Sequence, residues 1–476
     1  MSTTIVWFRD DYRLGDHPAL YHAIKRGQII PVAIYHPPMY GEWPWGGASR
    51  WWQQTSLARF AERLASRGIP LVARVGDPMN VLREIAHATG ADYVYWNRSY
   101  LPSLDRFDIE LQEVLASAGV GSEVFPGKLL HEPDQITTGA GGLYRVFTPY
   151  WRAKQLRPIE QPLPTVDIHA GHAAKHGLPT TPMDVLTGAR KPAWTDKLAQ
   201  HWSPGEEAAQ EVLHVFSTSV IDTYAIDRDR PDRDGTSSLS PYLAQGDISA
   251  RQIWHNIIRH VGEIGTKAEP FLRQLAWRDF SYQLLVAMPH LTNAPMRNEF
   301  SLFPWEDDGD MLRKWQTGNT GYPMVDAAMR QLWQTGWMHN RARMIVASFL
   351  TKHLLTNWTW GAAWFWDTLV DADLANNTFG WQWSAGCGAD AQPYFRIFNP
   401  MSQGTKFDPE GRYVCRWLGP AFDALSTKFR HAPFNAPVAT SQYWYGRHDY
   451  PKPIIDHVQA RERALGAFAA IRGAQG

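Results

Sequence analysis

Between Ile5 and about Phe125, short β-rich runs alternate with amphipathic segments, and this alternation limits the fold more than any other feature of the sequence. The runs IVWF, IIPVAIY, PLVARV and DYVYW have the length and composition of buried strands. Segments such as 54–66 and 79–88 have the apolar spacing of helices. The alternation predicts βαβ units and a parallel sheet covered on both faces. No G-x-G-x-x-G follows the first run, so the usual dinucleotide-binding fingerprint is absent.

The pattern changes in the second half of the chain. Residues from about 157 to 204 are rich in Pro, His, Ala and Gly without sustained periodicity, which predicts a long connector. Apolar residues at helical spacing follow at 248–260, 270–288, 324–334 and 337–355. The chain of 476 residues also exceeds the size at which a single core keeps growing. We therefore predict an α/β domain followed by an all-α domain.

Charge and cysteine content exclude several functional classes. The 47 basic and 47 acidic residues balance, so any contact with nucleic acid must use a local patch. The two cysteines, Cys387 and Cys415, cannot form a four-cysteine metal site, and so few favour a reducing cytoplasm. Arg9 precedes any long apolar run, and the apolar run MIVASFL stops at Lys352. We therefore expect neither a signal peptide nor a membrane span.

The stretch DADLANNTFGWQW, residues 371–383, combines acids, amides and indoles that are costly to bury without partners. One explanation is a helix end with satisfied caps and two core tryptophans. The other is that the polar groups hold a planar, redox-active ligand. Asp371 and Asp373 form a D-x-D pair that suggests a divalent metal, but the neighbouring amides Asn376 and Asn377 argue against one. Arg343 is a plausible ion-pair partner for Asp371.

Three further motifs can each be explained either by a structural role or by a role in ligand binding. GTSSLSPYL, 235–243, offers hydroxyls and amides ahead of a helix, which suit a phosphate, although such a segment more often forms a solvated turn or N-cap. In WMHNRARM, 337–344, Asn340 and Met344 share a helix face that suits a planar polar ligand or simple packing. Trp277 in WRDFSY, with Gln274 on the same face, is a core indole or a stacking surface for a base.

Taken in order, the segments GTSSLSPYL, QLAWRDF, TGYPMVDAAMRQLWQTGWMHNRARMI, DADLANN and GADAQPYFRIFNP resemble the DNA photolyase and cryptochrome family. The similarity spans nearly the whole chain, including IVWFRDDYRLGDHPAL at the N-terminus. It implies a Rossmann-like α/β antenna domain at 1–130, an interdomain linker at 131–204 and a helical FAD-binding catalytic domain at 205–476. It also implies a second, antenna chromophore, methenyltetrahydrofolate or 8-hydroxydeazaflavin. The motif NRSYLPSLDRF departs from the Glu-bearing form in the family, so it does not identify which of the two antenna chromophores is bound.

The resemblance assigns FAD to residues from several segments. Asp371 and Asp373 would bracket the flavin and ribitol, and Asn377 would lie at flavin N5. The implied FAD-binding set is Tyr224, Thr236, Ser237, Ser238, Leu239, Ser240, Phe271, Arg278, Arg343, Asp371, Asp373 and Asn377. Trp381, Trp358 and Trp305 match the inner, middle and surface tryptophans of the family's electron relay. A chain of indoles divides the path into short hops and ends where solvent stabilises the radical.

The resemblance also implies a site for damaged DNA. Trp277 and Trp383 match residues that wedge a flipped-out pyrimidine dimer, and aromatic stacking is worth about 1–3 kcal/mol per base. Arg228 and Arg341 would hold phosphates, as the local patch that a neutral protein requires. The implied DNA-binding set is Arg228, Gln274, Trp277, Asn340, Arg341, Met344, Trp383 and Gln403.

One position departs from the cyclobutane-dimer photolyases: Gln274 stands where many of them have Glu. The eukaryotic (6-4) enzymes also have Gln there, but they carry His where this chain has Asn340. We therefore predict a blue-light-driven cyclobutane pyrimidine dimer photolyase, in which reduced FAD donates an electron to the flipped-out dimer. The residues taken to act in catalysis are Trp305, Trp358, Trp381, Asn377 and Gln274.

The predicted enzyme needs no metal and acts on UV-damaged DNA as a cytoplasmic monomer. Three alternatives stay open. A cryptochrome-type photoreceptor without repair activity would share the fold and the flavin site, and a (6-4) photolyase would act on a different lesion. A metal-dependent hydrolase using Asp371 and Asp373 would be active in the dark.

Overall fold

The computed structural model describes residues 2–187, 193–262, 267–391 and 395–473. It divides into two compact units. The first comprises Met1–Asp222 and Ser237–Pro289, and the second comprises Thr223–Thr236 and His290–Gly476. The predicted boundaries at 130 and 204 stay a prediction, and residues 188–192 of the predicted linker lie outside the described residues.

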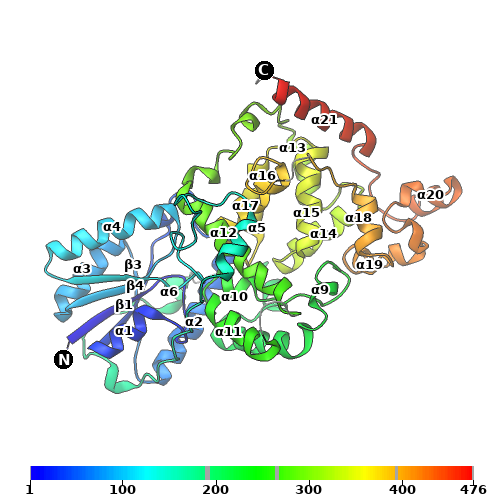
Figure 1. Cartoon of the computed structure of the whole chain (residues 1–476). Coiled ribbons are helices and arrows are strands. Elements are labelled where there is room, and N and C mark those ends of the chain that lie inside the picture. The colour runs from blue at the N-terminus through cyan, green and yellow to red at the C-terminus, as the bar shows by residue number, and fades with distance from the viewer. Residues whose placement is uncertain (1, 188–192, 263–266, 392–394, 474–476) are drawn as a thin grey trace. The chain divides into compact units, whose positions relative to one another are not determined.

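A five-stranded parallel sheet in the order β3-β2-β1-β4-β5 forms the centre of the first unit (Figure 1). Its strands are β1 (Ser2–Phe8), β2 (Gly27–Tyr35), β3 (Val72–Val75), β4 (Tyr93–Asn97) and β5 (Gly121–Phe125). In the register, Ile5 of β1 lies between Ile30 of β2 and Val94 of β4. All three side chains are fully buried, as expected for strands covered on both faces. The predicted fold class is confirmed.

Four helices connect the strands: α1 (Pro18–Arg26), α2 (Gly47–Ser66), α3 (Pro78–Thr89) and α4 (Pro102–Ser117). Figure 1 draws α3 and α4 on one side of the sheet and α1 on the other. Local signals explain the bounds of α3, because Asp77 caps its start, Pro78 opens it, and Gly90 in the left-handed region ends it. The helices predicted at 54–66 and 79–88 are present as parts of α2 and α3.

The rest of the first unit is helical or irregular. Its helices are α5 (Phe147–Gln155), α6 (Met183–Thr187), α7 (Thr195–Ala199), α8 (Glu206–Val215), α10 (Ser240–Ala244), α11 (Ala250–Val261) and α12 (Glu269–Ala287), with a π-helical turn at Phe216–Val220. The predicted connector at 157–204 carries only two short helices and one 3₁₀ turn among its described residues. The helices predicted at 248–260 and 270–288 correspond to α11 and α12.

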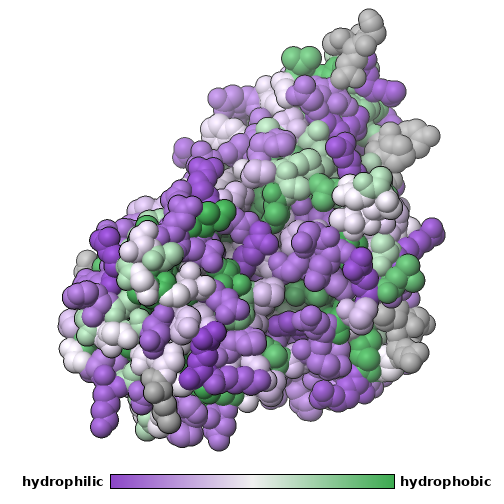
Figure 2. All heavy atoms as spheres, turned by 60° about the vertical axis from the view of Figure 1, so that its left-hand side comes forward, coloured by the Kyte–Doolittle hydropathy of each residue, from purple (hydrophilic) through white to green (hydrophobic). Residues whose placement is uncertain are grey.

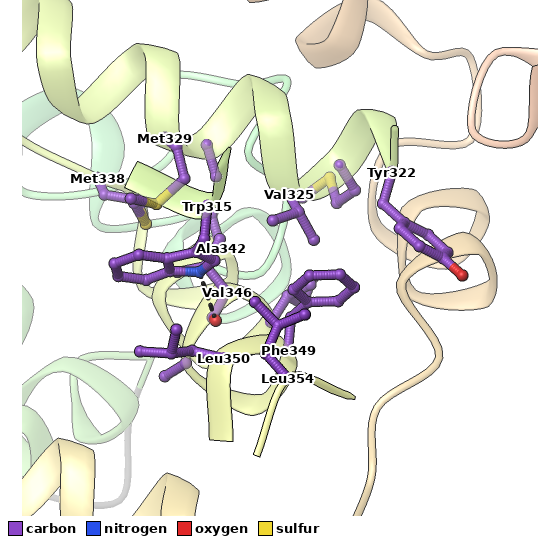
Figure 3. Close-up of a cluster of buried hydrophobic side chains, with 14 of the residues drawn as sticks. Trp315, Tyr322, Val325, Met329, Met338, Ala342, Val346, Phe349, Leu350 and Leu354 are labelled. Carbon is purple, nitrogen blue, oxygen red and sulfur yellow. Dashed lines mark hydrogen bonds between the residues drawn. The ribbon is translucent and has the colours of Figure 1, made fainter. Parts of the chain in front are cut away.

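The second unit contains only helices and loops in its described part. Its helices are α9 (Tyr224–Asp227), α13 (Gly309–Gln316), α14 (Pro323–Thr335), α15 (Asn340–Ser348), α16 (Trp358–Thr368), α17 (Leu374–Ala385), α18 (Pro400–Phe407), α19 (Arg412–Leu418), α20 (Val438–Tyr445) and α21 (His457–Gly473). Trp315 lies at the centre of the core, fully buried, and its indole N–H donates to the Val346 carbonyl at 3.0 Å (Figure 3). This buried N–H is therefore satisfied, as packing an indole in a core requires.

The single helix predicted at 337–355 is wrong at its start and along its length. The helix α15 begins only at Asn340, because His339 Nδ1 accepts from the backbone N–H of Arg341 at 3.1 Å and caps the first turn. After Ser348 the chain passes into a π-helical turn at Phe349–His353. Such turns insert one residue into the helical ladder, which an apolar spacing pattern does not reveal.

Neither Cys387 nor Cys415 forms a disulfide. No described helix is long and apolar enough to cross a membrane. On the face drawn in Figure 2, hydrophilic residues predominate and hydrophobic ones form small groups among them.

Candidate functional site

The acidic turn ahead of α17 is built around a buried ion pair. The Asp371 side chain is 4% exposed, and both of its carboxylate oxygens accept from Arg343 Nη2, at 3.0 and 2.8 Å. Arg343 Nε also donates to the Met338 carbonyl at 2.7 Å, which fixes the plane of the guanidinium. The predicted pairing of Arg343 with Asp371 is confirmed. Over the described residues, no group of three or more His, Cys, Asp and Glu side chains could hold a metal ion.

Asp373 acts as the N-cap of α17. Its carboxylate accepts from the backbone N–H of Asn376 at 3.0 Å and from the side-chain amide of Asn376 at 2.9 Å. Asn377 lies one residue further along the helix and is half-buried, with its Nδ2 donating to the Ala362 carbonyl at 2.9 Å. The capping explanation of DADLANN is therefore correct for Asp373, and it leaves the oxygen of the Asn377 amide as an acceptor.

Trp381 lies one turn beyond Asn377 on α17 and is 2% exposed. Its indole packs against Gly361 so closely that a Cβ at that position would lie 2.1 Å from Trp381 Cη2. The ring centroid is 5.0 Å from Phe365 and 6.1 Å from Trp315. Neither Trp315 nor Phe365 could be associated with Trp381 from the sequence, because no local spacing joins α13 or α16 to α17.

The other two predicted relay tryptophans differ in exposure. Trp358 opens α16 and is 2% exposed. Trp305 is partly exposed, and its ring lies 4.4 Å from that of Phe303. Exposure distinguishes only Trp305 from the other two, because Trp381 and Trp358 are equally buried, so the predicted inner and middle positions stay a prediction.

The GTSSLS loop has an unusual backbone. Ser238 has φ 53°, in the left-handed region, and Leu239 that follows is in the right-handed helical region. Successive residues of opposite hand turn their N–H groups into a concavity that suits an anion. The N–H of Leu239 also donates to Ser237 Oγ at 3.3 Å, which is the local turn that the structural explanation anticipated. Ser240 begins α10.

The helix α12 carries four of the predicted site residues. Phe271 is buried with its ring 4.5 Å from Phe216, and Arg278 Nη1 donates to the Lys128 carbonyl at 2.8 Å. Gln274 is half-buried, and its Nε2 donates back to the Pro270 carbonyl at 3.0 Å.

Trp277, on the same face of α12 as Gln274, already has a stacking partner. Its ring lies 3.6 Å from the ring of Phe147, with 9° between the two planes. Phe147 was not expected here from the sequence, because it lies 130 positions earlier in the chain and in a segment without a recognised motif. The contact shows that one side of the Trp277 indole is held within the first unit.

Arg341 carries the predicted phosphate contact on α15. Its Nη2 donates to Asp229 Oδ1 at 2.9 Å, and its guanidinium lies 4.2 Å from the centroid of the Phe407 ring. Arg228, the other predicted phosphate contact, lies with its guanidinium 5.4 Å from the Tyr224 ring. The remaining predicted DNA-binding residues of this unit are exposed or half-buried: Asn340, Met344, Trp383 and Gln403.

His339 is a further residue that the sequence analysis missed. It is 3% exposed, and burial, together with the nearby Arg341, Arg343 and Arg228, lowers its pKa to about 4, with Asp229 opposing the shift. The ring is therefore neutral, and because Nδ1 accepts the capping bond, Nε2 carries the proton. Nε2 has no acceptor within the part of the chain that the structure describes.

The second unit therefore brings together Arg343, Asp371, Asp373, Asn377 and Trp381, and separately Tyr224, Arg228 and Arg341. The first unit holds a different part of the predicted set: Ser237, Ser238, Leu239, Ser240, Phe271, Gln274, Trp277 and Arg278.

Comparison with known proteins identifies the family. One family model, described as DNA photolyase, matches residues 4–167, and another, described as the FAD binding domain of DNA photolyase, matches residues 271–470. The deoxyribodipyrimidine photo-lyase of Agrobacterium fabrum is 43% identical over 99% of this chain and 98% of its own. Cryptochrome-2 of Arabidopsis thaliana is 37% identical over 99% of this chain and 79% of its own.

A solved structure agrees with these sequence matches. The class III photolyase from Agrobacterium tumefaciens aligns with a TM-score of 0.92 at 42% identity, over 99% of this chain and 98% of its own. The chain belongs to the DNA photolyase family and contains its FAD-binding domain, which confirms the predicted resemblance and FAD as the cofactor.

The residues of the second unit fit FAD. Two carboxylates, on Asp371 and Asp373, are buried and rigidly held, and such groups accept hydrogen bonds from hydroxyls and ring N–H groups. The side-chain oxygen of Asn377 accepts no hydrogen bond from any described residue, so it is available to a donor on a ligand. Asn377 lies one turn before Trp381 on α17, an indole that can exchange electrons, and this combination suits a flavin.

Proposed function

We propose that the chain is a light-driven enzyme that repairs cyclobutane pyrimidine dimers in DNA. The full-length similarity to a deoxyribodipyrimidine photo-lyase supports this activity. The observation that carries the proposal furthest is the position of Asn377 and Trp381 one turn apart on α17, beside the Arg343–Asp371 pair. When bound and reduced, FAD supplies the electron that opens the dimer under blue light, and the electron then returns to FAD.

The chain's own residues bind and orient that cofactor. Asp371 and Asp373 would accept from its hydroxyl and ring N–H groups, and the Asn377 oxygen would accept from N5 when the reduced ring carries a proton there. The amides and hydroxyls of residues 236–240 bind its diphosphate, for which the backbone reversal at Ser238 is suited. Tyr224, Phe271 and Arg278 complete the binding set.

Three tryptophans would pass an electron inward, which leaves the oxidised indole at the surface member, where an external reductant restores it. Trp305 is the partly exposed member, Trp358 is the middle one, and Trp381 delivers the electron to the cofactor. The relay serves to reduce FAD and takes no part in opening the dimer.

The lesion is held by aromatic and polar side chains. Trp277 and Trp383 stack against the flipped-out bases, and Phe147 keeps the Trp277 indole in place from behind. Gln274, Asn340, Met344 and Gln403 surround the dimer, while Arg228 and Arg341 bind flanking phosphates.

For the whole chain we propose an antenna domain at 1–130, a linker at 131–204 and a catalytic domain at 205–476. The antenna chromophore is methenyltetrahydrofolate or 8-hydroxydeazaflavin. UV-damaged DNA is the partner, and the protein works as a cytoplasmic monomer.

One assay tests the activity. The photoreduced protein is mixed with an oligonucleotide that contains one thymine dimer, and with a second that contains a (6-4) lesion, in blue light and in the dark. We expect the dimer to be reversed only in light and the (6-4) lesion to persist. Repair of the (6-4) lesion alone would identify the other photolyase class, and repair of neither would favour a cryptochrome-type photoreceptor. Reaction in the dark that stops with a chelator would indicate a hydrolase.

A further inference from the structure

Asp229 forms an ion pair with Arg341, a residue that binds a DNA phosphate in the proposed function. The two side chains form one hydrogen bond, from Arg341 Nη2 to Asp229 Oδ1 at 2.9 Å. The Asp229 side chain is 39% exposed and that of Arg341 is 17% exposed, so the pair lies at the surface.

The guanidinium of Arg341 is held by more than this pair. Its face lies 4.2 Å from the Phe407 ring centroid, and its residue is in the first turn of α15, whose cap is the buried His339. Phe407 and the capped turn position the guanidinium, whereas Asp229 supplies the negative charge in front of it. A phosphate oxygen has the same charge and hydrogen-bonding chemistry as that carboxylate oxygen.

We propose that Asp229 is a built-in competitor for the DNA phosphate that binds Arg341. Without DNA the carboxylate neutralises the guanidinium, and on binding a phosphate oxygen takes its place while Asp229 turns to solvent. Asp229 thus sets how tightly the protein binds a duplex and how strongly that binding depends on salt. The inference rests on the proposed function in taking DNA as the ligand of Arg341.

The exchange has a measurable electrostatic consequence. The association constant for duplex DNA falls with salt concentration. Each phosphate that an unpaired cationic side chain neutralises contributes about −0.9 to the slope of its logarithm against the logarithm of the salt concentration. An arginine already paired with a carboxylate contributes less to this slope. On binding, the displaced carboxylate either stays near the phosphate or takes up a salt cation, and both effects offset the counterions released from DNA. Removing the charge of Asp229 restores the full contribution of Arg341.

The test is dark binding of the full-length, FAD-loaded protein to an undamaged duplex and to the same duplex with one thymine dimer, over a range of salt concentrations. Asp229→Asn is expected to tighten binding about two- to fivefold, the range of an exposed ion pair. The slope should become more negative by up to about 0.9. Weaker binding, or an unchanged affinity and slope, would overturn the proposal.

Two further variants separate competition from a general change of charge. Glu306→Gln removes the same charge from another half-exposed pair, Glu306–Arg463, whose arginine is on α21, far from α9 in Figure 1. It should leave the slope unchanged, and a shift as large as that of Asp229→Asn would overturn the proposal. In an Arg341→Ala background, Asp229→Asn should have no further effect, since the two residues act as one pair.

Failure of this inference can be distinguished from failure of the proposed function. If Arg341→Ala itself leaves the binding unchanged, Arg341 does not bind phosphate and the inference is overturned. Reversal of thymine dimers in light is measured independently, so the proposed activity is unaffected by that result.

Discussion

Arg341 and Arg343 lie on the same helix, α15, yet their carboxylate partners differ tenfold in exposure, 39% for Asp229 and 4% for Asp371. Both oxygens of Asp371 bind Arg343, whose Nε is also tied to a carbonyl, whereas Asp229 offers Arg341 one oxygen. Burial makes the first pair costly to break, and exposure makes the second pair weak. The same side-chain chemistry thus gives a fixed support at one position and an exchangeable contact two residues away.

Among the variants that test the difference between the two pairs, Asp371→Asn should have the largest effect on stability. Removing one partner of a buried ion pair costs about 3–5 kcal/mol, and the lower end applies because the Arg343 side chain is 25% exposed. We expect the free energy of unfolding to fall by about 3 kcal/mol and FAD to be lost on gel filtration. Urea denaturation and the flavin absorbance of the eluted protein measure the two effects. Asp229→Asn is the matched control and should change stability by less than about 0.5 kcal/mol; equal losses would contradict the distinction.

A second test uses His339, which caps the helix that carries both arginines. Its pKa is about 4 in the folded protein and about 6.5 when unfolded, so the unfolded state binds more protons between these values. The free energy of unfolding should therefore fall as the pH drops from 6.5, by about 2 kcal/mol at pH 5 from this group alone.

The variant His339→Asn keeps a capping acceptor and removes the titration. Its urea denaturation at pH 7 and pH 5 should show a smaller loss than the wild type, by about 2 kcal/mol. The other buried histidines titrate in both proteins and cancel. A loss identical to that of the wild type would show that His339 does not stay neutral as described.

Gly361→Ala probes the packing around Trp381. The added Cβ would lie 2.1 Å from the Trp381 ring, and such overpacking typically costs about 1–3 kcal/mol. We expect lower stability and slower photoreduction of oxidised FAD, because the indole must shift. Gly380→Ala on α17 is the control, since a Cβ there meets nothing within 4 Å. It should be neutral or stabilising by up to about 1 kcal/mol. Equal photoreduction rates in both variants would argue against Trp381 as the inner relay member.

The smallest effect on binding is expected for Gln274→Glu in the first unit. The Gln274 amide donates one N–H to the Pro270 carbonyl at 3.0 Å and keeps a second N–H, whereas a protonated Glu has a single O–H, which must leave Pro270 to reach the dimer. A neutral acid donates a stronger hydrogen bond than an amide to negative charge that develops on the dimer. Repaired dimers per absorbed photon should therefore rise, while dimer affinity changes by less than roughly 1 kcal/mol. An unchanged yield with unchanged affinity would mean that Gln274 does not reach the substrate.

The sequence predicted those parts of the molecule that depend on local periodicity or on family motifs. The strands IVWF and DYVYW are recognisable because buried parallel strands are continuously apolar, and the pairing of Arg343 with Asp371 followed from complementary charges in two motifs. The late start of α15 was not predictable from spacing, because it depends on the capping bond of His339 to Arg341.

Contacts between distant segments were beyond the sequence. Phe147 behind Trp277, Trp315 beside Trp381, and Asp229 in front of Arg341 each join segments with no shared periodicity or motif. Such contacts are set by how helices pack, which one sequence does not encode locally. The sequence therefore identified residue types suited to flavin and DNA chemistry, and the structure supplied the neighbours that hold or compete for them.

The residues joined by the Asp229–Arg341 contact are 112 positions apart in the chain. Ribosomes add about 5–20 residues per second, so roughly 6–22 seconds pass between the emergence of the carboxylate and that of its arginine. The strands of the sheet are all made before residue 126 and can pair meanwhile. The segment Thr223–Thr236, which groups with the later helices, must wait for them during synthesis. Translation order thus means that this segment, in which acidic and basic residues alternate, can dock on α15 only after residues 340–348 have been made.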